Sequence, residues 1–140
     1  MTTADAILAD VLDNPDEDWP RLIYTDWLAD NDQSDRAEFI RVQIELWKRR
    51  DEYDSFDLDE RGPTYNTLQR RERELRTVTN LVNWTPNHIA FAAPTVCYFR
   101  RGFVDEIRLS TKDFLTHAGT IFRCQPVMRV VLTDKEPDDA

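Results

Sequence analysis

Two short amphipathic patterns on either side of a polar turn constrain the fold more than any other feature of this sequence. The first runs from Arg21 to Asp30 and the second from Asp35 to Gln43, and both mix aromatic residues with charged ones. Apolar residues recur at the spacing of a helix that buries one face. The two patterns therefore predict a pair of packed helices. They indicate a recognition or capping module, because they contain no catalytic motif.

Further helices are expected on both sides of this pair. A first helix is predicted by capping threonines and by apolar residues at helical spacing: Thr2, Thr3, Ile7, Leu8, Val11 and Leu12. Pro20 suits the first turn of the second helix, where its missing N–H costs nothing. Asp35 and Glu38 have the spacing of a capping box for the third helix. That helix is apolar on a wide face as far as Trp47, which predicts contacts with two neighbours.

The next segment changes from an acidic loop to an arginine-rich helix. We interpret residues 51–63 as an exposed loop. A single fourth helix, ended by Pro86, is predicted by Leu68, Leu75, Val78, Leu81, Val82 and Trp84.

After Pro94 the pattern becomes strand-like. Residues 95–99 and 103–109 predict two strands joined by a turn at Arg101-Gly102. Ser110 or Thr111 is expected to cap a helix that Pro126 stops. Residues 127–132 are then expected to form a further strand, whose inward side chains should pack on that helix: Val130 and Leu132 on Phe114, Leu115 and Ile121.

The predicted fold class is therefore α+β, with an N-terminal helical bundle followed by a hairpin and a single strand–helix–strand (βαβ) unit. We expect a helical domain over residues 1–94, a small βαβ cap packed on it over residues 95–134, and a frayed tail over residues 135–140. Ile107 and Val130 lie 23 residues apart, within the period of a leucine-rich repeat. One such unit cannot bury its own face. Either the helical region completes the core, or the last strand pairs with a partner.

The residues of the paired helices also carry a family resemblance. The segment RLIYTDWLADN…DRAEFIRVQIEL resembles the bacterial repeat-companion domain, an N-terminal module often found ahead of leucine-rich repeats. The resemblance covers residues 4–47 and, more loosely, residues 98–132. It departs from the family at Asn31–Asp35, where a glycine is usual. The resemblance implies a companion or cap for a repeat array, and it carries over no catalytic residue.

Charge is distributed unevenly along the chain. Residues 1–35 hold ten acids and one base, which equals the net charge of −9 of the whole chain, so the remainder is neutral. An acidic N-terminal third repels phosphates, and it suits either a basic partner or solubility alone.

Metal binding and catalysis find no support in the motifs. Four potential zinc ligands lack the usual spacing of a zinc site: His88, Cys97, His117 and Cys124. The segment from Asp30 to Ser34 imitates the start of a calcium loop, but Arg41 stands where a bidentate glutamate is needed. The chain has three glycines and no G-x-S-x-G motif. We expect no metal, no cofactor and no enzymatic activity.

Nucleic-acid binding is the main alternative to protein binding. Arg70, Arg73 and Arg76 recur at about helical spacing and would make one helix face positive. Glu72 and Glu74 interrupt that helix, which favours a solvated, salt-bridged face. The alternative hypothesis is therefore a small accessory subunit of a nucleoprotein complex that contacts phosphates through the three arginines.

Two sets of residues are candidates for contacts beyond the ordinary core. The partner-binding set lies on the last strand and the hairpin turn, and comprises Val127, Arg129, Val131, Arg100 and Arg101. The second set is expected to form a partly buried ion-pair network that fixes helix orientation, and comprises Tyr24, Asp26, Trp27, Arg36, Glu38, Phe39 and Arg41. Within it, Trp27 and Phe39 are predicted to join the second and third helices.

The sequence thus predicts a cytoplasmic, non-enzymatic adaptor module. Met1–Asp5 has no basic signal-peptide region, and no apolar run approaches the roughly 18 residues of a membrane span. Two cysteines are too few for a disulfide framework. The expected partner is a protein, with a homodimer through the last strand as an alternative and no membrane contact.

Overall fold

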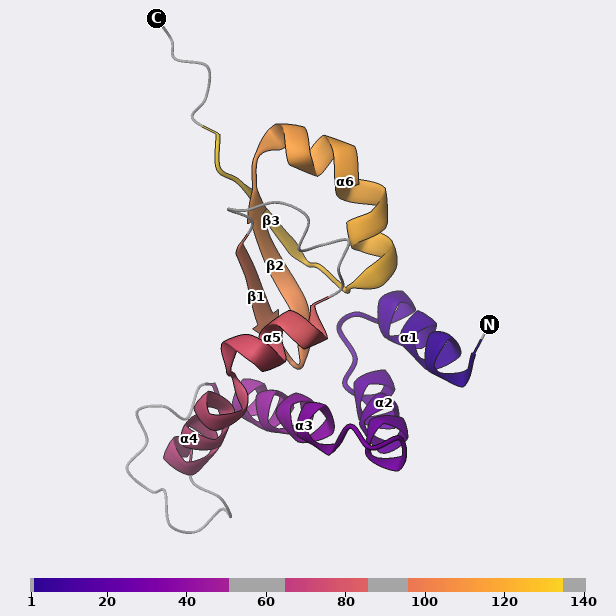
Figure 1. The fold of residues 1–140 in the computed structure, drawn as a ribbon, viewed down its shortest axis with the longest axis vertical. Coiled ribbons are helices and arrows are strands. Elements are labelled where there is room, and N and C mark those ends of the chain that lie inside the picture. The colour runs from indigo at the N-terminus through magenta and orange to yellow at the C-terminus, as the bar shows by residue number, and fades with distance from the viewer. Residues whose placement is uncertain (1, 51–64, 86–95, 135–140) are drawn as a thin grey trace, which may run out of the picture.

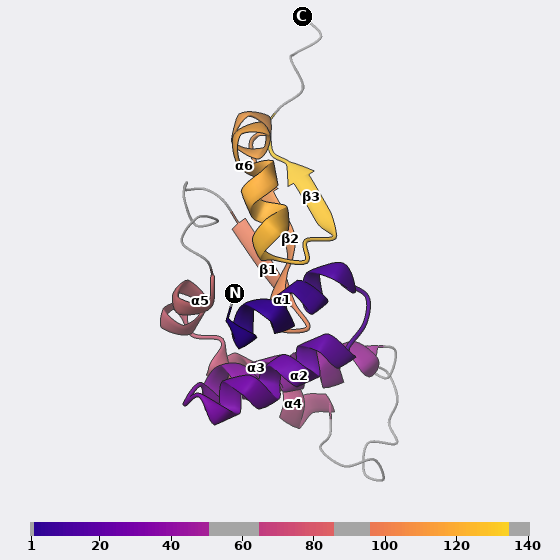
Figure 2. The same cartoon turned by 90° about the vertical axis from the view of Figure 1, so that its right-hand side faces the viewer.

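The computed structural model describes residues 2–50, 65–85 and 96–134. The described residues form six α-helices and a three-stranded sheet, so the chain is a mixed α+β protein, as predicted. Figures 1 and 2 show α1 to α5 gathered at one end, with the sheet and α6 standing at the other. Within the described ranges, no helix is both long and apolar enough to cross a bilayer. The predicted loop at residues 51–63 and the predicted tail at residues 135–140 lie outside them.

Local side-chain chemistry accounts for the start of the first two helices but not of the third. In α1 (Thr3–Asp13), the Thr2 hydroxyl accepts from the Asp5 N–H at 3.1 Å, and the Asp5 carboxylate accepts from the Thr2 N–H at 3.0 Å. In α2 (Trp19–Asp30), Pro20 occupies the first turn, as predicted. The start of α3 (Ser34–Lys48) has no side-chain cap. The predicted capping box is therefore wrong, because the carboxylate of Glu38 binds Arg71 of the next helix instead.

The single fourth helix of the prediction is in fact two helices, α4 (Tyr65–Leu75) and α5 (Val78–Trp84). The Thr77 hydroxyl accepts from the Asn80 N–H at 3.1 Å and so caps α5. The Asn80 side chain in turn donates to the Leu75 carbonyl at 2.7 Å, at the end of α4. These local bonds offer the backbone an alternative to a continuous helix, which is why the apolar periodicity alone was misleading.

The three strands lie in the order β1-β2-β3. Strands β1 (Val96–Arg100) and β2 (Phe103–Leu109) form an antiparallel hairpin. Helix α6 (Thr111–Cys124), capped by the Ser110 hydroxyl, then crosses over to β3 (Arg129–Leu132), which pairs parallel to β2. Strand β3 starts two residues later than predicted, because Val127 turns into the core and is 7% exposed.

The core consists of three clusters that share the hairpin. One lies among α1, α2 and α3 and includes Phe103 of β2. A second lies between the sheet and α6, around Ile107 and Ile121. The third joins α3 to α4 and α5 and contacts Phe99 of β1. Phe99 and Phe103 therefore pack the hairpin against the helices, and the wide apolar face of α3 serves two neighbours as expected.

Two packing predictions need correction. Phe39 is fully buried but does not join α2 to α3: its ring contacts Trp84 and Phe99, with centroids 4.9 and 6.0 Å away. Position 39 lies on the face of α3 that meets α4 and α5, whereas Ile40 and Ile44 take the other face. Trp27 is half-buried and stacks on Tyr24 of its own helix.

The second correction concerns the contact between β3 and α6. Val130 packs inward as predicted, but Leu132 is 47% exposed and Leu115 is 74% exposed. Phe114 and Ile121 suffice to cover the four-residue strand, so the neighbouring stripe of α6 remains in solvent.

Candidate interaction surface

The hairpin turn is seated directly on α3. Arg101 and Gly102 both have positive φ, at 52° and 85°, a conformation that glycine adopts without cost. A Cβ atom at position 102 would lie 2.2 Å from Cγ1 of Ile40. The Gly102 N–H also donates to the buried side chain of Gln43 at 2.7 Å. This close approach places Arg100 and Arg101 beside the C-terminal half of α3.

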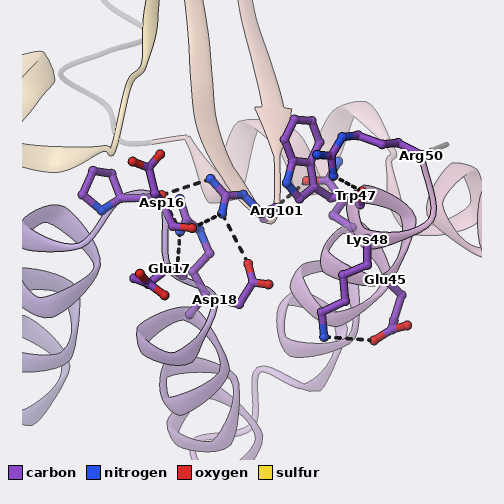
Figure 3. Close-up of polar contacts among 12 residues, drawn as sticks. Asp16, Glu17, Asp18, Glu45, Trp47, Lys48, Arg50 and Arg101 are labelled. Atoms are coloured by element: carbon purple, nitrogen blue, oxygen red, sulfur yellow. Dashed lines mark hydrogen bonds and ion pairs between the residues drawn. The ribbon is translucent and has the colours of Figure 1, made fainter.

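Arg101 holds the loop between α1 and α2. Its guanidinium donates to the carbonyls of Pro15 and Asp16 at 3.0 and 2.9 Å and lies 3.3 Å from the carboxylate of Asp18, as Figure 3 shows. Arg21 donates to the same loop, to the Pro15 and Glu17 carbonyls, each at 2.8 Å. Arg101 is only 6% exposed. The guanidinium of Arg101, a residue predicted to bind a partner, is therefore used mainly to bind the loop.

The guanidinium of Arg21 lies beside that of Arg101 at this loop, and its pKa is lowered. Burial lowers the pKa of Arg21 to about 10, and repulsion from Arg101 adds to that effect, while Asp18 and Asp105 oppose it. Arg21 remains charged at neutral pH, so its two carbonyl bonds are charge-assisted. The loop is thus tied to both α2 and the hairpin.

Trp47 near the end of α3 gathers arginines from two distant segments. The guanidinium carbons of Arg50, Arg100 and Arg101 lie 4.0, 4.6 and 5.6 Å from its ring centroid, within the range of cation–π attraction. Figure 3 shows Arg101 lying between Trp47 and the acidic loop. We call Trp47, Arg50, Arg100 and Arg101 the arginine–tryptophan surface. From the sequence, Trp47 was placed only on the apolar face of a helix. Its position directly before Lys48-Arg49-Arg50 was the one sequence signal for a contact with arginine.

The sheet face opposite α6 continues this surface. Tyr98, Glu106 and Arg129 form one row across the three strands. Glu106 accepts from Arg108 at 3.0 Å and lies 3.2 Å from Arg129, so one carboxylate lies between two guanidinium groups. The Arg108 guanidinium also lies over the Tyr98 ring, at 4.9 Å. This face is polar, charged and accessible to solvent, unlike the face that α6 covers.

Of the five residues predicted to bind a partner, the structure brings three together. Arg100, Arg101 and Arg129 line one hollow of about 300 Å³, along with Trp47 and Met128. Val131 is half-buried, two residues beyond Arg129 on the same side of β3. Val127 lies in the core instead, so its side chain is not available to a partner.

The residues expected to form one ion-pair network form three separate contacts. Asp26 and Arg41 pair at 3.0 Å in solvent. Glu38 pairs with Arg71 and so links α3 to α4. Arg36 has neither role; its guanidinium lies over the rings of Tyr24 and Phe103, at 5.6 and 5.7 Å. Arg41 pairs with α2, Glu38 pairs with α4, and Arg36 lies against aromatic rings, so no single network forms.

The Glu38–Arg71 pair predicts a pH-dependent contribution to stability. Hydrogen bonding from Arg71 lowers the pKa of Glu38. The contribution should therefore be present above the unfolded-state pKa of about 4.3 and should disappear as the pH falls through the lowered value. Glu38→Gln should cost at most about 1 kcal/mol at pH 7, since solvent screens the pair, and nothing near pH 2. Urea unfolding at both pH values measures this.

Asp26→Asn is the matched control for that experiment, because its carboxylate also binds an arginine from another helix position but is more exposed. We expect no measurable loss for the control at either pH. An equal loss for Glu38→Gln at both pH values would show that the effect comes from packing and not from the ion pair.

Other chemistry is sparse in the part of the chain that the structure describes. There, no three histidine, cysteine or acidic side chains are grouped to hold a metal ion. Cys97 and Cys124 form no disulfide, and burial raises the pKa of both thiols, so both stay protonated at neutral pH. The three described arginines of the alternative hypothesis lie on or just after α4; Arg70 and Arg73 are exposed, and Arg76 lies 3.8 Å from Glu72.

Comparison with known proteins gives no guide to function, so the geometry of this surface is the basis for the proposal below. No family model, curated protein or solved structure matches the chain.

Proposed function

We propose that this chain is a non-enzymatic protein-interaction module, an adaptor or cap that adds a partner's strand to the outer edge of β3. The observation that carries the proposal is the position of β3 at the edge of the described sheet. An edge strand presents unpaired N–H and C=O groups, which a further strand can satisfy. The Met128 N–H donates inward to Asp105, so alternation along the strand directs the amides of Arg129 and Val131 outward.

The connection between β2 and β3 supports the role of a cap. The two strands are parallel, a helix joins them, and Ile107 pairs in register with Val130. A further unit of the same kind would continue the sheet beyond β3, as in a leucine-rich-repeat array. The proposed role agrees with the resemblance of residues 4–47 to the repeat-companion domain.

Exposed apolar side chains near this edge also favour docking. Met128 directly precedes β3 and is 53% exposed, and Leu132 is the last residue of β3 and is 47% exposed. Leu115 and Phe122, seven residues apart on one side of α6, are 74% and 47% exposed. Burying side chains of this size contributes about 1.5–3 kcal/mol each. A partner that supplies both a strand and an apolar helix would cover both elements.

Amide hydrogen exchange on the purified chain tests this proposal. In a monomer verified by sedimentation, the amides of Arg129 and Val131 should exchange rapidly, whereas the inward amide of Val130 should be protected. Protection of the outward amides that rises with protein concentration would identify a second copy of the chain as the partner. Full protection in the dilute monomer would contradict the proposal, because the edge would then be covered internally.

Proline substitution at the edge provides a second readout. Val131→Pro removes an outward amide, which an edge strand tolerates, while Val131→Thr keeps it. Complex formation with the partner found by cross-linking in native host cells should be lost for the proline variant and kept for the threonine variant. Equal binding by both variants would contradict docking along β3.

A further inference from the structure

A cavity of about 470 Å³ lies on another part of the molecule, where α1 meets the ends of α5 and α6. Its apolar walls are formed by Leu8 and Leu12 of α1 and by the rings of Tyr24 and Trp84. Its charged lining residues are Arg36, Arg123 and Asp5, together with neutral polar groups. The volume falls within the range of small-molecule sites. None of these residues belongs to the arginine–tryptophan surface or to β3.

Arg36 is the unusual residue of this cavity. A guanidinium has five N–H donors. Among residues 2–50, 65–85 and 96–134, the Arg36 guanidinium makes one long hydrogen bond, from Nη1 to the Trp84 carbonyl at 3.4 Å. Its buried Nε has no partner there. Within the same ranges it forms no ion pair. A largely buried charge without a counter-ion is costly.

The other two buried arginines also have an Nε without a partner among the described residues, but their terminal nitrogens are better bonded than those of Arg36. Arg21 donates two bonds of 2.8 Å to carbonyls. Arg101 makes three polar contacts of 2.9 to 3.3 Å, one of them with a carboxylate. Among the described residues, Arg36 has only the long bond to Trp84 and the two aromatic rings of Tyr24 and Phe103, and it lines the cavity of about 470 Å³. A ligand in this cavity would therefore lie against the Arg36 side chain.

Gln125 and Asp5, two other polar residues of the cavity, already bond within the chain. Gln125 accepts from the Val104 N–H at 3.0 Å and donates to the Cys124 carbonyl at 2.7 Å. Asp5 is held in the capping box by Thr2, and those bonds lower its pKa, so it stays negative. Arg123 is exposed, lines the cavity, and uses its Nε on the Gly119 carbonyl. Two arginines against one carboxylate leave a net positive site.

We propose that this cavity binds a small organic anion, whose charged group pairs with Arg36 and Arg123 and whose apolar body lies against Leu8, Leu12 and Trp84. A carboxylate and a phosphate monoester share the required chemistry, since both accept two parallel N–H bonds from a guanidinium. Burial lowers the pKa of Arg36, and a bound anion would oppose that effect. The aromatic and aliphatic walls select a ligand with an apolar body over a bare inorganic ion.

Titration with matched probes, followed by amide NMR shifts of the full chain, tests the site. The probes are 3-phenylpropionate, phenyl phosphate, the uncharged 3-phenylpropanamide and inorganic phosphate. We expect one of the two organic anions to shift residues around Leu8, Arg36 and Trp84, with affinity at least about tenfold above that of the amide and of inorganic phosphate. The tighter of the two anions identifies the charged group that the site prefers.

Variants separate the site from general charge effects. Arg123→Gln should weaken binding about three- to tenfold, and Ala9→Phe, which fills part of the cavity, should abolish it. Arg36→Lys keeps the charge but loses the two-pronged geometry, so it should weaken binding about tenfold. Arg70→Gln, on the exposed side of α4, is the matched control and should bind like the wild type.

Several outcomes would overturn the proposal. They are the absence of binding by both organic anions at millimolar concentration, equal affinity for the uncharged amide, and equal weakening by Arg70→Gln. If Arg36→Lys fails to fold, Arg123→Gln and Ala9→Phe still decide: unchanged affinity in both variants means that the anion binds elsewhere.

Discussion

Replacing Gly102 with alanine is expected to lower the free energy of unfolding by about 2–5 kcal/mol, a large part of the stability of a domain of this size. Two costs add at this position. The positive φ of 85° disfavours a residue with a Cβ atom, by about 1–2 kcal/mol. The new methyl group would also lie 2.7 Å from Cβ and 2.9 Å from Cα of Ile40, so relief requires the backbone to move, at a cost of about 1–3 kcal/mol. Urea unfolding monitored by circular dichroism measures the change.

Gly119 offers a matched control within the same chain. It lies in the middle of α6, is exposed, and a Cβ there would approach nothing closer than an Arg123 nitrogen at 3.6 Å. Gly119→Ala should stabilise the protein by about 0.5–1 kcal/mol, since alanine is the better helix former. Opposite signs for the two substitutions are the expected result. A Gly102→Ala variant as stable as the wild type would mean that the turn does not sit on α3.

Truncation of Phe39 to alanine is expected to cost about 3–5 kcal/mol, the usual loss for a fully buried phenylalanine. Its side chain is 0% exposed and joins α3 to Leu75 of α4, Trp84 of α5 and Phe99 of β1. The cavity left behind would lie between α3, α4, α5 and β1. Small shifts of these elements cannot fill it well. Chemical denaturation should show a large fall in the unfolding midpoint.

Trp27→Ala is the natural comparison, because the sequence placed both aromatics in the same role. Trp27 is half-buried and contacts the edge of the α1–α3 cluster through Tyr24. Its truncation should cost less than half as much as that of Phe39, although tryptophan is the larger side chain. Equal losses would contradict the packing described here, since they would require Trp27 to be as buried as Phe39.

Helix and strand ends that are set by residues close in the sequence could be predicted from the sequence. Thr2, Pro20 and Ser110 begin α1, α2 and α6 because a cap or a missing N–H acts within one helical turn. The hairpin followed in the same way from Arg101-Gly102, where the backbone adopts positive φ. The break between α4 and α5 was missed although its cause, Thr77, is also local, because apolar spacing continues across it.

The interaction surface was only partly predictable. Arg100 and Arg101 stood out as a basic pair, and the strand ending at Leu132 stood out as an edge. Their relation to Trp47 did not, since more than fifty positions separate it from Arg100. Composition identifies an arginine as a charged surface residue by default, so neither the buried bonds of Arg101 nor the position of Arg36 over two aromatic rings was foreseen.

Local rules were thus enough for the α+β class, for most helix ends and for the hairpin, because capping, proline geometry and apolar periodicity act over a few residues. Tertiary packing alone decided which charges are buried and which are paired. Helix α3 meets α2 on one side and α4 on another, so Arg36 lies against the rings of Tyr24 and Phe103 whereas Arg41 pairs with Asp26 in solvent. The free energy of each charge depends on the neighbours that the fold brings to it, and distant segments supply those neighbours.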